Sequence, residues 1–268
     1  MGAGIAQVAA QAGFTTLLFD LSEPALQKAE QSISKNLQSL VDRQRMKEEE
    51  KADILSQIRF SSNLQDCIAD IIIEAIVEKT APKIALFNQL AEINHSETVF
   101  ATNTSSLSVT TIADGVMQPS RVIGMHFFNP APLMKLVEVV KTEKTAGAVV
   151  QTVMELAGAM KKTAVLCEDA PGFIVNRVAR HYYLEALRLA EEHAIDYTTI
   201  DDIMESAGFK MGPFRLMDLI GNDINLAVTE SIYEALHREP RLAPSALQKE
   251  KVKTGELGRK TQKGYYTY

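Results

Sequence analysis

Apolar residues in the first 168 positions follow two alternating patterns. Short runs that are almost continuously apolar or β-branched are typical of strands buried on both faces. The runs that predict strands are Thr15–Asp20, Asp70–Ala75, Thr98–Asn103, Arg121–His126, Leu136–Val140 and Thr163–Leu166. Stretches with helical spacing lie between several of these runs, and they are Glu23 to about Arg45, Pro82–Ile93 and Thr145–Met160. This order predicts an α/β fold with a doubly wound, mostly parallel sheet of the Rossmann type.

The pattern changes after the sequence Asp169-Ala170-Pro171-Gly172. From Phe173 onward the spacing is helical and no run has the character of a strand. Two breaks in the helical pattern stand out, at Gly208–Pro213 and at Gly221. We therefore predict two domains, residues 1–168 with a dinucleotide-binding fold and residues 169–268 with an all-helical fold.

Composition and charge narrow the class of protein. The chain has 268 residues, 46% hydrophobic and 23% charged, which excludes an intrinsically disordered protein. A net charge of −6 lacks the basic excess of a nucleic-acid-binding surface, although a local basic patch can still hold an anionic small ligand. No apolar run reaches the roughly 18 residues of a membrane span. The cysteines, Cys67 and Cys167, show no metal-binding pattern, so we expect two free thiols in a cytoplasmic protein that binds neither nucleic acid nor membranes.

The first twenty residues carry part of a dinucleotide-binding signature. Gly2 is followed by an alanine-rich helical stretch and then by a strand that ends in Asp20, eighteen residues after the glycine. A carboxylate at that position accepts hydrogen bonds from an adenosine ribose, while the helix N-terminus faces a pyrophosphate. The residues after Asp20 are not basic, which favours NAD over NADP. The remaining glycines of the signature are not present, so Gly2 and Gly4 are equally compatible with close helix packing alone.

A histidine and a glutamate mark the second candidate site. His126 ends a predicted strand, and Glu138 lies twelve residues later in the next one. A carboxylate that holds one ring N–H of an imidazole leaves the other nitrogen free to accept a substrate proton. Taken alone, the pair is also compatible with a structural histidine.

Nine stretches in order resemble the short-chain 3-hydroxyacyl-CoA dehydrogenases of the 3-hydroxybutyryl-CoA type. The stretches are Met1–Ala6, Glu74–Glu78, Asn103–Leu107, His126–Pro130, Lys135–Val140, Pro171–Arg177, Met211–Pro213, Asp218–Gly221 and Gly258–Tyr265. They cover the chain from Met1 to Tyr268. The resemblance implies NAD-dependent oxidation of a 3-hydroxyacyl-CoA, with a helical second domain that forms a homodimer.

The resemblance also implies roles for individual residues. His126 would be the base that takes the proton of the 3-hydroxyl group, and Glu138 would orient and stabilise its imidazole. Ser105 and Asn176 match residues that hydrogen-bond the reacting oxygen of the substrate. Positions that match cofactor-binding residues are Met1, Gly2, Asp20, Ala75, Glu78, Lys83, Asn103, Asn129 and Lys260.

Recognition of coenzyme A requires positive charge, because it carries a 3′-phosphate and a pyrophosphate. The predicted helix that begins at Glu23 places Lys28, Lys35 and Arg43 on one face, and the family uses basic residues of this helix for the CoA phosphates. Lys35 and Arg43 are therefore candidate substrate-binding residues, although a solvated helix face explains them equally well. A short substrate such as 3-hydroxybutyryl-CoA is the first expectation. The alternative is 3-hydroxyadipyl-CoA, because the Arg180–Tyr183 and Gly208–Pro213 stretches resemble dehydrogenases of phenylacetate breakdown.

Two non-enzymatic interpretations stay open at this point. The same motifs resemble the lambda-crystallins, which are structural lens proteins, and an inactive relative that binds CoA without NAD would share them as well. In the family, a strand and two further glycines precede the position of Met1. We therefore expect the natural protein to begin upstream, and we expect a sheet with a gap at its centre.

Overall fold

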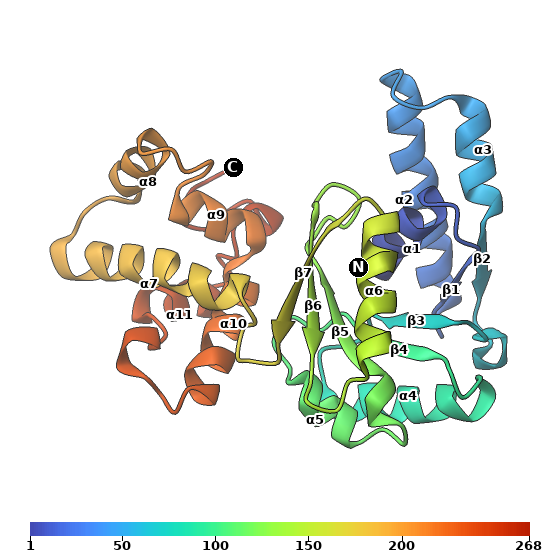
Figure 1. Ribbon diagram of the computed structural model, residues 1–268. Coiled ribbons are helices and arrows are strands. Elements are labelled where there is room, and N and C mark those ends of the chain that lie inside the picture. Colours follow the sequence, from blue (N-terminus) through green and yellow to red (C-terminus); the bar gives the residue numbers. More distant parts are fainter. The chain divides into compact units, whose positions relative to one another are not determined.

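All 268 residues are described by a computed structural model, in which the chain divides into two units, Met1–Asp169 and Ala170–Tyr268. The first unit combines strands and helices, and the second contains helices and short turns only (Figure 1). None of the helices combines the length and the apolar character that crossing a bilayer requires.

The strands of the first unit form a mostly parallel arrangement. They are β1 (Thr16–Phe19), β2 (Ile58–Ser61), β3 (Ile71–Glu74), β4 (Val99–Thr102), β5 (Val122–Phe127), β6 (Leu136–Lys141) and β7 (Thr163–Glu168). Every neighbouring pair is parallel except β5 and β6, which are antiparallel. All six predicted strands are present, and the fold is the predicted Rossmann type. The prediction missed β2, which is four residues long and carries the exposed Arg59.

The sheet is interrupted between β1 and β3. Strands β1 and β2 pair with each other, and the other five strands form a separate sheet in the order β3-β4-β5-β6-β7. Gly2 lies at this interruption, because a Cβ atom on it would be 3.6 Å from Leu18 in β1 and 4.0 Å from Ala75 just after β3. The interruption agrees with the gap that we expected from the sequence.

The helices of the first unit are α1 (Gly2–Gln11), α2 (Glu23–Asp42), α3 (Glu48–Ser56), α4 (Thr80–Ile93), α5 (Val109–Asp114) and α6 (Gly147–Ala159). Helices α2 and α3 pack with α1 and the β1–β2 pair, whereas α1 and α6 cover one face of the larger sheet and α4 and α5 the other. Successive side chains of β4 point to opposite faces of the sheet. Val99 and Ala101 therefore pack in one cluster with α1 and α6, while the Phe100 ring contacts Phe87 of α4 on the other face. These two apolar layers hold the strand ends that carry the candidate site.

The predicted helix from Glu23 to about Arg45 is too long. Helix α2 ends at Asp42, Arg43 is its C-cap, and Gln44 adopts a left-handed backbone with φ of 57°. The left-handed residue reverses the chain toward α3. The prediction read the polar turn as helix because charged residues continue on both sides of it.

The second unit is all helical, as predicted from the change of pattern. Its helices are α7 (Val175–His193), α8 (Tyr197–Ser206), α9 (Pro213–Ile220), α10 (Asn222–Ala235) and α11 (Ala246–Lys253). The core contains Leu187 of α7, Phe214 and Met217 of α9, and Ile232 of α10. Both predicted breaks separate helices, and at the second one Gly221 has a φ of 105°, which favours glycine.

Candidate active site

The candidate residues of the first unit gather at the carboxyl ends of neighbouring strands. Glu78 follows β3, Asn103 follows β4, and His126 is the penultimate residue of β5. Carboxyl ends of parallel strands meet at one edge of a sheet, and that edge is where ligands bind in doubly wound folds. The sequence motifs therefore converge because of the parallel topology.

His126 and Glu138 are direct cross-strand partners in the antiparallel pair β5–β6. The Nδ1 atom of His126 lies 2.8 Å from Oε2 of Glu138, and the two residues are 4% and 1% exposed. An ionised carboxylate only accepts hydrogen bonds, so a proton on Nδ1 satisfies this contact and Nε2 is then the ring nitrogen that can accept a proton. The Phe128 ring lies beside the imidazole, with 4.6 Å between the ring centroids. The pair has the geometry of a general base with its orienting carboxylate.

The Ser105 loop is held by Glu78. Oε1 of Glu78 accepts hydrogen bonds from the Thr104 hydroxyl at 2.6 Å and from the backbone N–H groups of Ser105 at 2.8 Å and Ser106 at 3.2 Å. Burial alone would raise the pKa of Glu78. The hydrogen bond from Thr104 and the positive charge of Lys83 outweigh it, so the pKa lies below its ordinary value. Glu78 therefore stays ionised near neutrality and fixes the loop on which Ser105 lies.

Asn103 joins the ends of two strands. Its Oδ1 atom accepts a hydrogen bond from the backbone N–H of Phe127 at 2.8 Å, next to His126. Asn129 follows β5 and is exposed. Asn103 thus contributes to the position of the histidine, and the role of both asparagines toward a cofactor stays a prediction.

The beginning of α1 and the end of β1 fit the adenosine half of a dinucleotide. The first N–H groups of a helix lack partners within it, and Met1 provides no side-chain cap at this end. Gly2 has no side chain at this end of the helix, and the atoms nearest to an added Cβ belong to Leu18 at 3.6 Å and Ala75 at 4.0 Å. Asp20 follows β1 directly, is exposed, and accepts a hydrogen bond only from the backbone N–H of Ser22 at 2.9 Å. One carboxylate oxygen of Asp20 is therefore available for ribose hydroxyls.

Lys83 is enclosed by two carboxylates. It lies in the first turn of α4, it is only 1% exposed, and its Nζ atom is 2.6 Å from Glu74 and 3.3 Å from Glu78. Glu74 was not among the predicted site residues. The signal that could have found it is its place as the polar residue that ends an otherwise apolar strand.

Asn176 and Lys260 belong to the second unit. Asn176 lies in the first turn of α7, where its carbonyl oxygen accepts a hydrogen bond from Nε of the buried Arg180 at 3.1 Å. Lys260 forms an ion pair with Asp223, with Nζ 2.6 and 2.7 Å from the two carboxylate oxygens. Their roles toward substrate and cofactor stay predictions.

The basic residues assigned to CoA are exposed. Lys28 and Lys35 lie on α2, whereas Arg43 follows the end of the helix. Exposed cations are compatible both with phosphate binding and with a solvated helix face. Lys35 and Arg43 therefore stay predictions.

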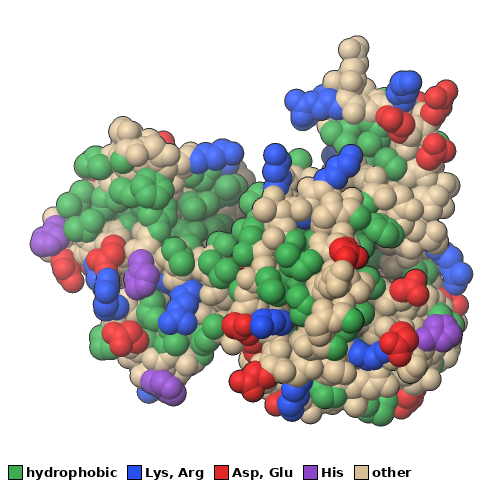
Figure 2. Space-filling view, in the orientation of Figure 1, with side chains coloured by type: hydrophobic (Ala, Val, Ile, Leu, Met, Phe, Trp, Pro, Cys, Tyr) green, Lys and Arg blue, Asp and Glu red, His purple; other side chains and the backbone are tan.

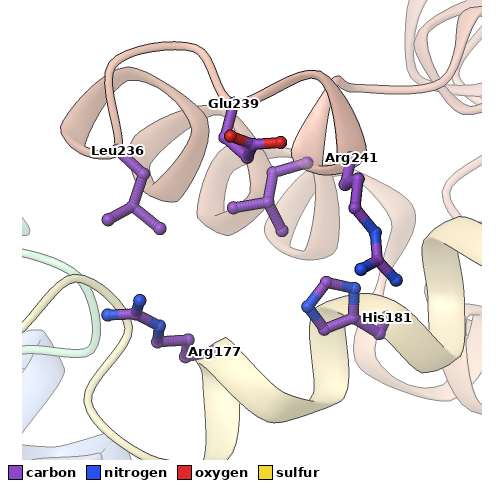
Figure 3. Close-up of a pocket in the computed structure, with 6 residues that line it drawn as sticks. Arg177, His181, Leu236, Glu239 and Arg241 are labelled. Atoms are coloured by element: carbon purple, nitrogen blue, oxygen red, sulfur yellow. The ribbon is translucent and has the colours of Figure 1, made fainter.

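A cavity of about 410 Å³ lies within the second unit. Figure 3 shows Arg177 and His181 projecting from α7 on one side of it, and Leu236, Glu239 and Arg241 on the other. None of the predicted site residues lines this cavity. This cavity is therefore separate from the candidate residues at the strand ends of the first unit.

The fold and the site together define a class. A mostly parallel sheet with helices on both faces, a glycine at the first helix N-terminus and an acidic residue after the next strand are features of NAD-binding Rossmann domains. A buried histidine–carboxylate pair lies at the same edge, and an alcohol dehydrogenase reaction requires a proton acceptor.

Comparison with known families agrees with this class. Residues 1–170 match the family model described as 3-hydroxyacyl-CoA dehydrogenase, NAD binding domain, and residues 172–268 match the model of the C-terminal domain of the same family. The chain belongs to the 3-hydroxyacyl-CoA dehydrogenase family, which is a family of oxidoreductases.

Relatives are similar over the full length of this chain. It is 46% identical over 270 residues to a 3-hydroxyadipyl-CoA dehydrogenase of Escherichia coli K12, and 39% identical to a probable 3-hydroxybutyryl-CoA dehydrogenase of Bacillus subtilis. A crystal structure of (S)-3-hydroxybutyryl-CoA dehydrogenase from Ralstonia eutropha is similar with a TM-score of 0.96 at 35% identity.

The relatives differ in the fraction of their own length that this chain covers. This chain spans 57% of the length of the Escherichia coli relative, 94% of the Bacillus subtilis relative and 95% of the Ralstonia eutropha chain.

Proposed function

We propose that this protein oxidises a short (S)-3-hydroxyacyl-CoA to the 3-oxoacyl-CoA with NAD as the electron acceptor. The observation that supports this most directly is the buried His126–Glu138 pair, with 2.8 Å between Nδ1 and Oε2. An alcohol is too weak an acid to lose its proton unaided near neutrality, so a positioned base is needed as hydride leaves. Family membership supports the same reaction class.

His126 and Glu138 have different roles in the proposed proton transfer. Nε2 of His126 accepts the proton of the 3-hydroxyl group, and the ring becomes positively charged. Glu138 stabilises that charge from the opposite side of the ring, through the proton on Nδ1. Ser105 is proposed to donate a hydrogen bond to the same substrate oxygen, which fixes the carbon and its hydroxyl group in one orientation. Asn176 stays a candidate for the same role.

The cofactor is proposed to lie along the strand ends of the first unit. The N-terminus of α1 would face the pyrophosphate and Asp20 would accept the ribose hydroxyls, while Glu78, Asn103 and Asn129 line the nicotinamide side. NAD supplies the hydride acceptor when it is bound.

The acyl group is proposed to be short, with 3-hydroxybutyryl-CoA as the first candidate. The second candidate is 3-hydroxyadipyl-CoA, which is supported by the 46% identity to the Escherichia coli relative of that name. Comparison of kcat/KM for the two acyl-CoA thioesters decides between them.

The central experiment measures NADH formation at 340 nm with (S)-3-hydroxybutyryl-CoA. We expect activity in the wild-type protein and a loss of roughly 10²- to 10⁴-fold in His126→Ala, which is the usual contribution of a general base. The matched control is His193→Ala, which removes an exposed histidine at the end of α7 and should leave the rate unchanged. Unchanged turnover in the folded His126→Ala protein would remove the base assignment. No turnover of either thioester by the wild-type protein would favour a lambda-crystallin-like or inactive CoA-binding role instead.

A homodimer through the second unit is part of the proposal. Figure 2 shows hydrophobic side chains gathered on the surface of this unit, and Val178, Ile203, Phe209, Leu219 and Ile224 are among its exposed apolar residues. Exposed apolar surface of this kind is typical of subunit interfaces. Sedimentation analysis that finds a monomer at micromolar concentration would contradict it. A cytoplasmic location likewise stays a prediction, based on the two free cysteines.

A further inference from the structure

Lys83 occupies an unfavourable place for a cation. It is buried, and it lies in the first turn of α4, where the helix dipole is positive. A buried ammonium group in such a place requires carboxylate partners. The structure provides two, because Nζ of Lys83 is 2.6 Å from Oε1 of Glu74 and 3.3 Å from Oε2 of Glu78.

Glu74 is the rigid member of this cluster. Its side chain is fully buried, Oε1 also accepts the backbone N–H of Ile76 at 2.7 Å, and Oε2 accepts the hydroxyl of Thr102 at 2.7 Å. Thr102 is the parallel cross-strand partner of Glu74 in the β3–β4 pair. Three donors from β4, α4 and the backbone after β3 thus hold this carboxylate in one position.

Glu78 is the adaptable member. Its side chain is 39% exposed, and its two oxygens serve different partners. Oε2 faces Lys83, whereas Oε1 accepts the N–H groups of Ser105 and Ser106 and the hydroxyl of Thr104. The position of the Glu78 carboxylate is therefore set by two opposing interactions, the electrostatic attraction of Lys83 and the hydrogen bonds from the Ser105 loop.

We infer that Glu74 is a positioning residue for Ser105, because it neutralises Lys83 and so leaves Glu78 free to hold the Ser105 loop. The functional consequence rests on the proposed function, in which Ser105 hydrogen-bonds the reacting oxygen. The structural consequence does not, since the contacts from Glu74 to Lys83, from Lys83 to Glu78 and from Glu78 to the loop amides are independent of any reaction. Glu74 lies among the residues that end β3 and was assigned no role by the sequence motifs.

The first test is amide hydrogen exchange of Glu74→Gln. The variant keeps the size and the hydrogen-bonding oxygen of the side chain but removes its charge, so Lys83 draws Glu78 toward itself. We expect the amides of Ser105 and Ser106 to exchange roughly tenfold faster, as loss of one hydrogen bond to a charged group predicts. Exchange in β6 should be unchanged. Wild-type protection at both serines would overturn the inference, whether or not the protein proves to be a dehydrogenase.

The second test is a double-mutant cycle between Glu74 and Ser105. Glu74→Gln should lower kcat roughly tenfold with little change in KM, since the affected hydrogen bond serves the transition state. In a Ser105→Ala background, Glu74→Gln should have no further effect, because its influence passes through Ser105. An equal fall of kcat in both backgrounds would show that Glu74 has only a general structural role, and would also overturn the inference.

Control variants distinguish a failure of the Glu74 inference from a failure of the proposed dehydrogenase function. Glu97→Gln removes an exposed carboxylate that pairs with Arg121 in the same unit and should change neither exchange nor kcat. If Glu74→Gln does not fold, Thr102→Val replaces it, because it removes one donor to Glu74 and keeps a β-branched residue in β4. We expect faster exchange at Ser105 in that variant as well, and unchanged exchange would overturn the inference. An inactive wild-type protein would defeat the proposed function, while the exchange experiment would still decide the role of Glu74.

Discussion

Replacement of Glu138 by glutamine isolates the electrostatic part of the proposed mechanism. The variant keeps the volume of the side chain and an oxygen that can accept the proton of Nδ1 at the observed 2.8 Å, but it removes the negative charge. Because Glu138 is 1% exposed, water cannot replace that charge. The charge matters only when the ring of His126 becomes positive, which occurs during the reaction.

The expected fall in kcat of Glu138→Gln has a lower and an upper limit. A hydrogen bond to a charged partner contributes about 1 kcal/mol more than one between neutral groups, which sets a lower limit of about fivefold in kcat. Two unit charges about 4 Å apart interact by about 4 kcal/mol at the effective dielectric constant of protein sites, which sets an upper limit of about a thousandfold. We therefore expect kcat of Glu138→Gln to fall by about a hundredfold, between these limits, with KM for the acyl-CoA nearly unchanged.

The assay is steady-state NADH formation at saturating NAD, with His126→Ala measured in parallel. The double variant should be no slower than His126→Ala alone, because Glu138 acts only through the imidazole. Near-ultraviolet circular dichroism checks that packing around the buried pair is retained. The reasoning is refuted if Glu138→Gln keeps wild-type kcat, or if the double variant loses the product of the two single effects.

Two further predictions concern thiol reactivity and packing. Burial raises the pKa of both Cys67 and Cys167 to about 11, so only about a thousandth of each thiol is ionised at pH 8. Alkylation by iodoacetamide should therefore be slow, and its rate should rise about tenfold per pH unit. Labelling as fast as in the urea-unfolded protein would contradict this prediction. Gly264→Ala should lower Tm strongly, since the new Cβ would clash with Oδ1 of the buried Asp218. Gly158→Ala, with nothing within 4 Å, should raise stability by about 0.5–1 kcal/mol, and equal Tm values for the two variants would refute the packing argument.

The fold was predictable because its periodicity is strong where burial is complete. Thr98–Asn103 and Arg121–His126 were recognised as strands since helices cover both of their faces, which requires continuous apolar residues. Strand β2 was not predicted, because four residues at the edge of the arrangement with an exposed Arg59 have no pattern that distinguishes them from a loop. The end of α2 was missed for a similar reason, since its polar C-terminal turn is chemically like the helix surface before it.

The candidate site was predictable only in part. The sequence pointed to His126 and Glu138 through motifs, but a spacing of twelve residues does not bring two side chains together. The antiparallel register of β5 and β6 does so, by pairing the two residues directly. Glu74 was missed because its importance depends on Thr102 and Lys83, which come from other elements.

The sequence by itself determined six of the seven strands, the change of pattern after Asp169 and the residue types that carry chemistry, because these depend on local periodicity and composition. Only the tertiary structure decided which polar groups share a buried environment. The cluster of Glu74, Lys83 and Glu78 arises from strand order and helix packing. Electrostatic interactions of buried groups depend on distance in space and on exclusion of water, and neither is a property of neighbouring positions in the chain.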